Sequence, residues 1–206
     1  LPSITPRNDG GIWKVVDDAT GNYVYEQAVI NDNALHMAFM DNETITDGTI
    51  KTKFKLSYES DEQMRLYFRM DANGNGYAAY VGRYNNNCYL RLYTVSNYSL
   101  SVLLQEVYYS NLFASGDWHT LKVELEGSSI KVYIDDQVSY INRKHLAYTQ
   151  GTIAIGTCNL NYAAQFDDIS VKHVVVNENL SQMPLPSITP RNDGGIWNVV
   201  DEGTGN

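Results

Sequence analysis

Arginine and tyrosine residues alternate with apolar residues along two segments of this 206-residue chain. The six residues are Arg65, Tyr67, Arg69, Tyr89, Arg91 and Tyr93. A tyrosine ring stacks on the apolar face of a sugar ring and also offers a hydroxyl. Arginine presents a planar fork of N–H donors to hydroxyls or to a carboxylate. The pattern therefore indicates a surface that binds polysaccharide, neutral or anionic, and a uronate-containing polysaccharide is one such ligand.

A third segment carries Lys51, Lys53 and Lys55 with the same spacing. An ordinary explanation competes with a binding role, because the outward positions of antiparallel sheets are usually polar and solvated. The sequence does not show whether the three segments are neighbours in one sheet. A binding face and a set of solvated strands therefore both remain open as interpretations.

Alternation with a period of two predicts that these segments are β-strands with one apolar side. The apolar positions are Ile50, Phe54, Leu56, Met64, Leu66, Phe68, Met70, Leu90, Leu92, Leu121, Val123, Leu125, Ile130, Val132 and Ile134. Glycine- and asparagine-rich turns separate the runs at 71–76, 84–87 and 126–129. Strands of this kind bury their apolar sides by stacking two antiparallel sheets. The sequence therefore predicts an all-β, two-sheet antiparallel β-sandwich.

Charge and composition narrow the range of partners. The formal net charge of −9 argues against a nucleic-acid ligand. Membrane insertion is not expected, because no apolar run approaches the about 18 residues of a spanning helix. Sixteen tyrosines, together with abundant asparagine and glycine, are typical of secreted or cell-surface β-proteins.

The first 22 residues of the chain recur almost unchanged as residues 185–206. The differing pairs are Lys14 and Asn198, Asp18 and Glu202, and Ala19 and Gly203. Such self-similarity predicts a tandem repeat with a period of 184 residues. The expected parts are a linker over 1–11, a module over 12–176, an inter-repeat linker over 177–194, and the first strand of the next repeat over 195–206, a copy of 11–22.

Several stretches resemble concanavalin A-like, laminin-G-like jelly-roll modules of the kind appended to bacterial pectate lyases and glycoside hydrolases. SGDWHTLKVELEGSSIKVYIDDQ (115–137), GTIAIGT (151–157) and QFDDISVK (165–172) resemble the second half of that fold. LYFRMDANGNGYAAYV (66–81) resembles its middle, and IWKVVDDATGNYVYEQ (12–27) resembles its start. The resemblance implies a jelly roll in which Trp118 starts a strand and packs into the core.

Catalytic members of this superfamily place paired carboxylates on one strand, typically as E-x-D-x-E, so that both reach one glycosidic bond. The nearest match here is Glu124-Leu125-Glu126, which comes directly before a tight turn and has no third acid. We therefore expect no catalytic residues and no enzyme activity.

The sequence leaves two questions open: whether the chain holds a structural calcium ion, and whether its two cysteines form a disulfide. Many carbohydrate-binding jelly rolls hold structural calcium near the chain ends, and Asp168 with Asp17 or Asp18 would supply oxygen ligands. The alternative is that these aspartates cap turns. Cys88 and Cys158 are either two buried thiols or a disulfide of a secreted protein.

Sandwiches of this kind serve as lectins, enzymes, adhesins and spacers, so fold alone does not assign function. The expected function is a non-catalytic, lectin-like carbohydrate-binding module, repeated along a secreted or cell-surface protein. Its expected partners are a polysaccharide and neighbouring copies of the same repeat. The alternative is a structural or adhesive repeat that assembles head-to-tail into filaments by donating a strand from residues 185–206 to a neighbour.

Overall fold

The computed structural model describes residues 1–56, 62–84, 87–110, 116–137 and 140–174. Within these ranges the chain forms fourteen strands and no helix. The strands make two sheets of seven, and every described pairing between neighbours is antiparallel. The predicted all-β, two-sheet sandwich is confirmed.

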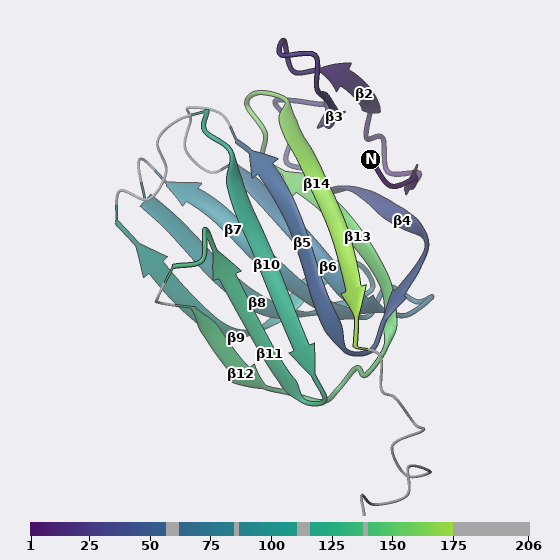
Figure 1. Ribbon diagram of the computed structural model, residues 1–206, viewed down its shortest axis with the longest axis vertical. Helices are drawn as coiled ribbons and strands as arrows, with labels where there is room; N and C mark the ends of the chain where they lie inside the picture. The colour runs from purple at the N-terminus through teal and green to yellow at the C-terminus, as the bar shows by residue number, and fades with distance from the viewer. Residues whose placement is uncertain (57–61, 85–86, 111–115, 138–139, 175–206) are drawn as a thin grey trace, which may run out of the picture. The chain divides into compact units, whose positions relative to one another are not determined.

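Sheet A has the strand order β1-β4-β13-β6-β7-β8-β9. Its strands are β1 (Ile4–Pro6), β4 (His36–Ile45), β13 (Gly151–Cys158), β6 (Gln63–Met70), β7 (Gly76–Tyr84), β8 (Asn87–Ser96) and β9 (Ser99–Tyr109). Sheet B has the order β12-β11-β10-β5-β14-β3-β2. Its strands are β12 (Ile141–Lys144), β11 (Ser129–Ile134), β10 (His119–Glu126), β5 (Gly48–Lys55), β14 (Ala164–His173), β3 (Tyr23–Gln27) and β2 (Trp13–Asp17). In Figure 1, β10, β5 and β14 cross in front of β6, β7 and β8.

The core lies between the two sheets and is built from the alternating apolar positions. In β5, for example, Ile50 and Phe54 are fully buried whereas Lys51 and Lys53 are exposed. The other large core side chains include Met64, Leu66, Phe68, Leu90, Leu92, Leu121, Val123, Ile130, Val132 and Phe166. Burial of each such side chain contributes about 1.5–3 kcal/mol to folding. The same alternation turns every second residue of these strands away from the core.

Asparagine, aspartate and glycine form the turn between β6 and β7, as the sequence predicts. The Asp71 carboxylate accepts hydrogen bonds from the backbone N–H groups of Asn73 and Asn75, both at 2.8 Å. Asp71 thereby holds β6 and β7 in a fixed register. That register decides which side chains meet on the outer side of sheet A.

The N-terminal residues contribute an edge strand to each sheet. β1 pairs with β4 in sheet A, and β2 pairs with β3 in sheet B. The Asp9 carboxylate accepts the backbone N–H of Met37 at 2.9 Å. Residues 1–11 were expected to form a linker, but Ile4–Pro6 lie within a sheet because their backbone groups pair with those of β4.

Leu1–His173 make up one compact unit. The expected linker over 177–194 and the copied strand over 195–206 lie outside the described residues. Cys88 and Cys158 are both free thiols, so the disulfide alternative is excluded in this structure. None of the described segments is a helix long and apolar enough to cross a membrane.

Candidate functional site

The three charged segments divide between the two sheets. Lys51, Lys53 and Lys55 lie on β5 of sheet B, whereas β6 and β8 belong to sheet A. Any surface shared by the predicted arginines and tyrosines is therefore confined to sheet A.

The register of sheet A brings four of the six predicted residues together and adds two tyrosines. Arg65 on β6 lies opposite Tyr80 on β7, which lies opposite Arg91 on β8. Arg91 lies opposite Glu106 on β9, and Tyr89 lies opposite Tyr108. We call this group the tyrosine–arginine face. It consists of Arg65, Tyr80, Tyr89, Arg91, Tyr93 and Tyr108, all on the side of sheet A turned away from the core.

Ring contacts hold the tyrosine–arginine face together. The Tyr80 ring lies between two guanidinium groups, with the Cζ atoms of Arg65 and Arg91 at 5.7 and 5.5 Å from its centroid. Arg91 also lies 4.9 Å from the Tyr89 centroid. The centroid of Tyr93 is 6.0 Å from that of Tyr80 in an edge-on arrangement. Such cation–π and aromatic contacts fix the ring orientations.

Two glycines allow rings to lie close against the sheet. A Cβ atom on Gly82 would be 2.5 Å from the Tyr80 hydroxyl oxygen, and one on Gly156 would be 3.0 Å from Cε2 of Tyr67. Tyr67 is completely buried and Tyr80 is 8% exposed. Tyr67 was expected among the binding residues, but its complete burial leaves no surface for a ligand, whereas Tyr80 forms part of the floor of the tyrosine–arginine face. Burial raises the pKa of the Tyr80 hydroxyl, which stays protonated at neutral pH and able to donate.

Access is greatest over β8 and β9. Tyr89, Arg91 and Tyr93 are half-buried, and Tyr108 is 50% exposed. The sequence analysis missed Tyr80 and Tyr108. Tyr80 alternates with the apolar residues Ala79 and Val81 in the stretch GYAAYVG, so its outward direction was visible, but its neighbours on β6 and β8 were not.

Arg69 does not belong to the tyrosine–arginine face, in contrast to the sequence-based expectation. The pairing of β13 with β6 shifts register near this residue, and Arg69 has a φ of 51°. This bulge turns its side chain toward backbone carbonyl oxygens of Thr46, Tyr148 and Gly127, which accept its N–H groups at 2.6–3.2 Å. Arg69 is 1% exposed, and its Nη2 also contacts Asp47 at 3.1 Å. Its role is structural.

The same bulge moves Met70 from the core to the outer side of sheet A. There it joins a second apolar cluster formed by Met37, Tyr67, Met70, Ala78, Val95 and Ala154. The Arg7 guanidinium caps one edge of this cluster, with its Cζ 4.1 Å from the Tyr98 centroid. The outer side of sheet A therefore has an apolar part and the tyrosine–arginine face.

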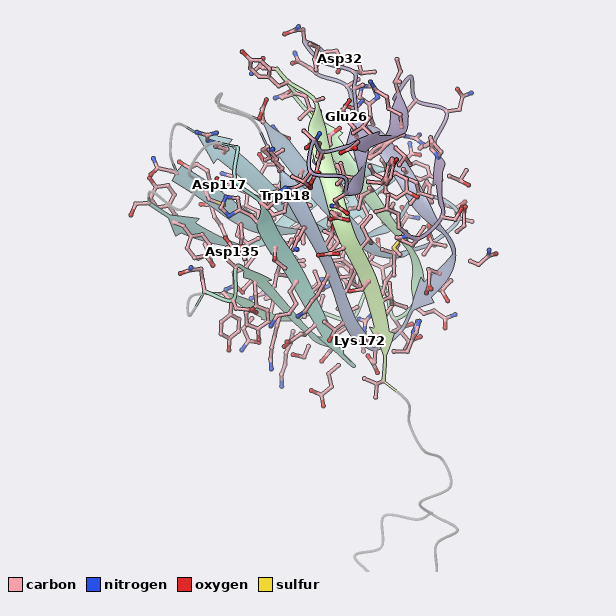
Figure 2. All side chains as sticks on the ribbon, turned by 45° about the horizontal axis from the view of Figure 1, so that its top comes forward. Glu26, Asp32, Asp117, Trp118, Asp135 and Lys172 are labelled. Carbon is pink, nitrogen blue, oxygen red and sulfur yellow. The ribbon has the colours of Figure 1, made fainter. Side chains whose placement is uncertain are left out.

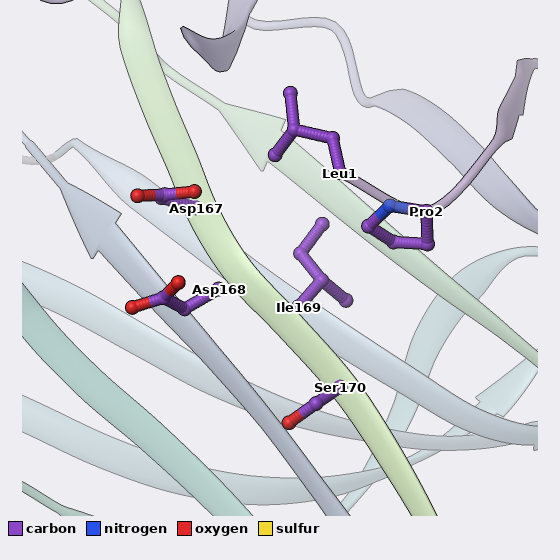
Figure 3. Close-up of a pocket in the computed structure, with 6 residues that line it drawn as sticks. All are labelled: Leu1, Pro2, Asp167, Asp168, Ile169 and Ser170. Carbon is purple, nitrogen blue, oxygen red and sulfur yellow. The ribbon is translucent and has the colours of Figure 1, made fainter. Parts of the chain in front are cut away.

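The predicted calcium ligands already have protein partners. The Asp17 carboxylate accepts the backbone N–H groups of Ala19 and Gly21 at 2.9 and 3.0 Å. Asp168 pairs with Lys53 at 2.6 Å. Asp168 also lines an open hollow of about 390 Å³ near Leu1 (Figure 3). A lysine ammonium beside Asp168 makes a poor neighbour for a divalent cation, so the fit to calcium is weak.

The acidic pair on β10 has a structural setting. Glu124 accepts the Tyr133 hydroxyl at 3.1 Å and lies 3.3 Å from the Lys122 ammonium. Directly before the same strand, Trp118 is half-buried (Figure 2). The Nζ atom of Lys55 lies 5.9 Å from the centroid of the Trp118 ring. Trp118 was expected to start a strand and to pack into the core. It does precede β10, but the core residues of this strand are Leu121, Val123 and Leu125, and Trp118 is not among them.

Among the described residues, no group of three or more His, Cys, Asp or Glu side chains is placed to hold a metal ion.

Comparisons with known proteins agree with this architecture. Residues 23–174 match the family described as galactocerebrosidase, C-terminal lectin domain. The search of curated proteins found no match to this chain.

Solved structures share the fold at low sequence identity. The carbohydrate-binding module CBM66 from Bacillus subtilis matches with a TM-score of 0.65 and 20% identity, covering 84% of this chain and 96% of that one. The exoplasmic/lumenal domain of VIP36, bound to Ca²⁺ and mannose, gives 0.55 and 13%, covering 85% and 86%. A Bacteroides ovatus GH16 protein in complex with a mixed-linkage glucan product gives 0.55 and 10%, covering 82% and 94%. At these identities the likeness establishes the fold and leaves the chemistry to the residues themselves.

Proposed function

The chain belongs to the galactocerebrosidase C-terminal lectin domain family, and we propose that it is a non-catalytic carbohydrate-binding module. Its ligand is a polysaccharide, neutral or uronate-containing, that binds along the tyrosine–arginine face. The observation that carries this proposal is the register of β6, β7, β8 and β9, which gathers four tyrosines and two arginines on one side of sheet A. Rings of this kind stack on sugars while hydroxyl and guanidinium groups orient them.

The names of similar proteins support the choice of ligand class. The matching family is a lectin domain, one structural neighbour is a carbohydrate-binding module, and another is bound to mannose. The GH16 neighbour shows that the same fold also occurs in a protein with a glucan product, so the absence of catalysis is part of the proposal. The support for a non-catalytic module is the setting of Glu124, whose carboxylate contacts Tyr133 and Lys122 rather than a second acid.

Binding to polysaccharides before and after removal of single rings tests the proposal. We expect Tyr89→Ala and Tyr93→Ala each to weaken binding by about 0.5–1.5 kcal/mol, because each removes one stacking surface. Affinity gel electrophoresis or a glycan array provides the measurement. Tyr23→Ala is the matched control, since Tyr23 is 62% exposed on β3 of the other sheet. Unchanged binding by both face variants would show that the sugar binds elsewhere.

The wider setting of the module is also a proposal. The recurrence of residues 1–22 at 185–206 supports a tandem repeat with a period of 184 residues. We propose that this repeat belongs to a secreted or cell-surface protein that carries further domains such as a pectate lyase or glycoside hydrolase.

A structural calcium ion at Asp17 and Asp168 is a further proposal, and such an ion would have to displace Lys53 from Asp168. A rise in unfolding temperature on adding Ca²⁺, abolished by Asp168→Asn, would establish it.

A second candidate function is head-to-tail assembly, and the N-terminal contacts favour it. The first copy of the repeated sequence pairs with the edges of both sheets through β1 and β2. Its contacting residues have identical counterparts in the second copy. These pairs are Ile4 and Ile188, Thr5 and Thr189, Arg7 and Arg191, Asp9 and Asp193, and Trp13 and Trp197. The second copy therefore has the side chains needed to occupy these edges in a neighbouring molecule.

Two of the differing residues make described side-chain contacts: Asp18 accepts hydrogen bonds from Thr20 within its own turn, and only Lys14 contacts a neighbouring strand. Lys14 lies 3.2 Å from Glu26, and its counterpart is Asn198. The Lys14 side chain is 52% exposed, so the loss costs at most about 1 kcal/mol. The second copy is thus nearly as well suited to the two edges as the first.

Light scattering over a concentration series distinguishes assembly from a monomeric module. We expect the full chain to form concentration-dependent oligomers and a chain ending at residue 184 to remain monomeric. Asp193→Ala is the matched point variant, because its counterpart Asp9 accepts the Met37 N–H. Monomers throughout the series for the full chain would exclude strand donation and leave the carbohydrate-binding proposal intact.

A further inference from the structure

The two arginines of the tyrosine–arginine face differ in their charge environment. Arg91 forms an ion pair with Glu106, the residue opposite it on β9. Arg65 takes part in none of the ion pairs formed by the described residues. The positive charge that this face offers to a ligand is therefore centred on Arg65.

Arg65 is also unusually buried for a charged side chain without a counter-ion, with 8% of its surface exposed. Its described hydrogen bonds go to neutral acceptors. Nη2 donates to Oε1 of Gln63 at 2.8 Å, and Nη1 donates to the Tyr67 hydroxyl at 3.3 Å. The buried Nε atom has no hydrogen-bond partner in the described part of the chain.

A buried charge of this kind lowers the stability of a fold unless it is paired. Arg69, four residues further along β6, shows the usual solution, with three carbonyl acceptors and a carboxylate around it. At Arg65 the corresponding counter-charge is missing among the described residues. The simplest origin of that counter-charge is the ligand.

Building on the proposed function, we propose that Arg65 binds the carboxylate of an acidic sugar and that the preferred ligand is a uronate-containing polysaccharide. Gln63 and Tyr67 hold the guanidinium in one orientation, so little conformational freedom is lost on binding. The half-buried Tyr93, whose ring is edge-on to Tyr80 at 6.0 Å, supplies the apolar surface for the sugar ring. A guanidinium matches the planar geometry of a carboxylate.

Because the whole chain is negatively charged, a preference for acidic polysaccharides has to come from a local site such as Arg65. With a net charge of −9, the protein repels polyanions in general. Binding of an acidic polysaccharide therefore requires a local positive group such as Arg65. Part of the affinity is then electrostatic, and we expect it to fall as ionic strength rises.

Matched pairs of polysaccharides test the proposal by isothermal titration calorimetry. The probes are polygalacturonate, alginate and hyaluronan, each compared with its own carboxyl-reduced, neutral form. We expect at least one acidic probe to bind about tenfold or more tightly than its neutral counterpart, the range for a hydrogen-bonded charge pair. Arg65→Gln should abolish this preference, and Arg65→Lys should retain only part of it. Arg143→Gln, at an exposed position on β12 of sheet B, is the control and should bind as the wild type does.

The outcomes separate this inference from the proposed function. Equal binding of acidic and neutral forms, or a preference that survives in Arg65→Gln, overturns the assignment of Arg65 but leaves the carbohydrate-binding function in place. Failure of the wild type to bind any polysaccharide, acidic or neutral, overturns both. If Arg65→Gln does not fold, as judged by its unfolding transition, the wild-type preference and its salt dependence still decide between a carboxylate ligand and a neutral one.

Discussion

At the scale of single residues, Arg65 and Arg69 show how one strand gives two identical side chains different tasks. Both were expected to point outward, because they share a period of two along β6. The bulge at Arg69 adds one residue to the strand and reverses the direction of everything beyond it. Arg65 therefore faces the surface, whereas Arg69 joins the loop after β4, the β10–β11 turn and Tyr148.

Removal of the Arg69 side chain should lower stability strongly. Arg69→Ala leaves the carbonyl groups of Thr46, Tyr148 and Gly127 without their donor in a site where water has little access. We expect the free energy of unfolding to fall by about 3 kcal/mol or more, as for other buried charged groups that lose a partner. Urea denaturation followed by tryptophan fluorescence measures it.

Two comparisons make the Arg69 result specific. Arg143→Ala, on the exposed side of β12, should change the free energy of unfolding by no more than about 0.5 kcal/mol. Under conditions where Arg69→Ala is fully folded, its polysaccharide affinity should equal that of the wild type. A loss of affinity without a loss of stability would return Arg69 to the binding site.

At the scale of elements, β1 is the weakest described part of sheet A, because it has three residues and lies at the edge. Its attachment depends on the half-buried Asp41, whose carboxylate accepts hydrogen bonds from the hydroxyl groups of Ser3 and Thr5 at 2.5 and 2.6 Å. These two hydrogen bonds lower the pKa of Asp41 below its ordinary value of 3.8. The carboxylate form thus holds β1 in place.

The docking of β1 should consequently depend on pH. Because the pKa of Asp41 is lower in the folded chain than in the unfolded one, its contribution is present above about pH 4 and is lost as the pH falls through the lower folded value. Hydrogen exchange at the Arg7 and Asp41 amides, which pair with Met37 and Ser3, reports this directly. Both amides should lose protection as the pH falls below about 4, ahead of the core amides of β6.

A variant separates this effect from general acid denaturation. Asp41→Asn keeps an acceptor oxygen but removes the charge, so β1 should already exchange faster at neutral pH and show little further change on acidification. Protection of β1 that follows the core amides at every pH, in both proteins, would contradict a role for Asp41.

At the scale of the whole molecule, the fold was predictable because its signal is local. Each strand carries its own alternation, as in β5 and β10, and the turns between strands carry glycine and asparagine. Two stacked antiparallel sheets are the arrangement in which such strands bury one side each. The order of the strands within the sheets has no such local signal.

The site was predictable only in part for the same reason. Arg65, Tyr89, Arg91 and Tyr93 were identified from their types and spacing, yet their meeting depends on β7, which lies between them and contributes Tyr80. The lysines of β5 carry an equivalent pattern but lie in the other sheet. A bulge of one residue and the choice of neighbouring strand are non-local properties, and these decided where Arg69 and the lysines of β5 lie.

The separation of core and surface along the same strands has an evolutionary consequence. On β7, Ala79 and Val81 belong to the core, whereas Tyr80 belongs to the tyrosine–arginine face and lies against Gly82. Substitutions in one set leave the other set's contacts intact, so recognition can drift without a matching loss of stability. Gly82 and Gly156 are the exceptions, since any side chain there would lift a ring from the sheet. Descendants of such a module can acquire new ligands by substitution of the exposed tyrosines and arginines, provided that Gly82 and Gly156 are retained and the rings stay close against the sheet.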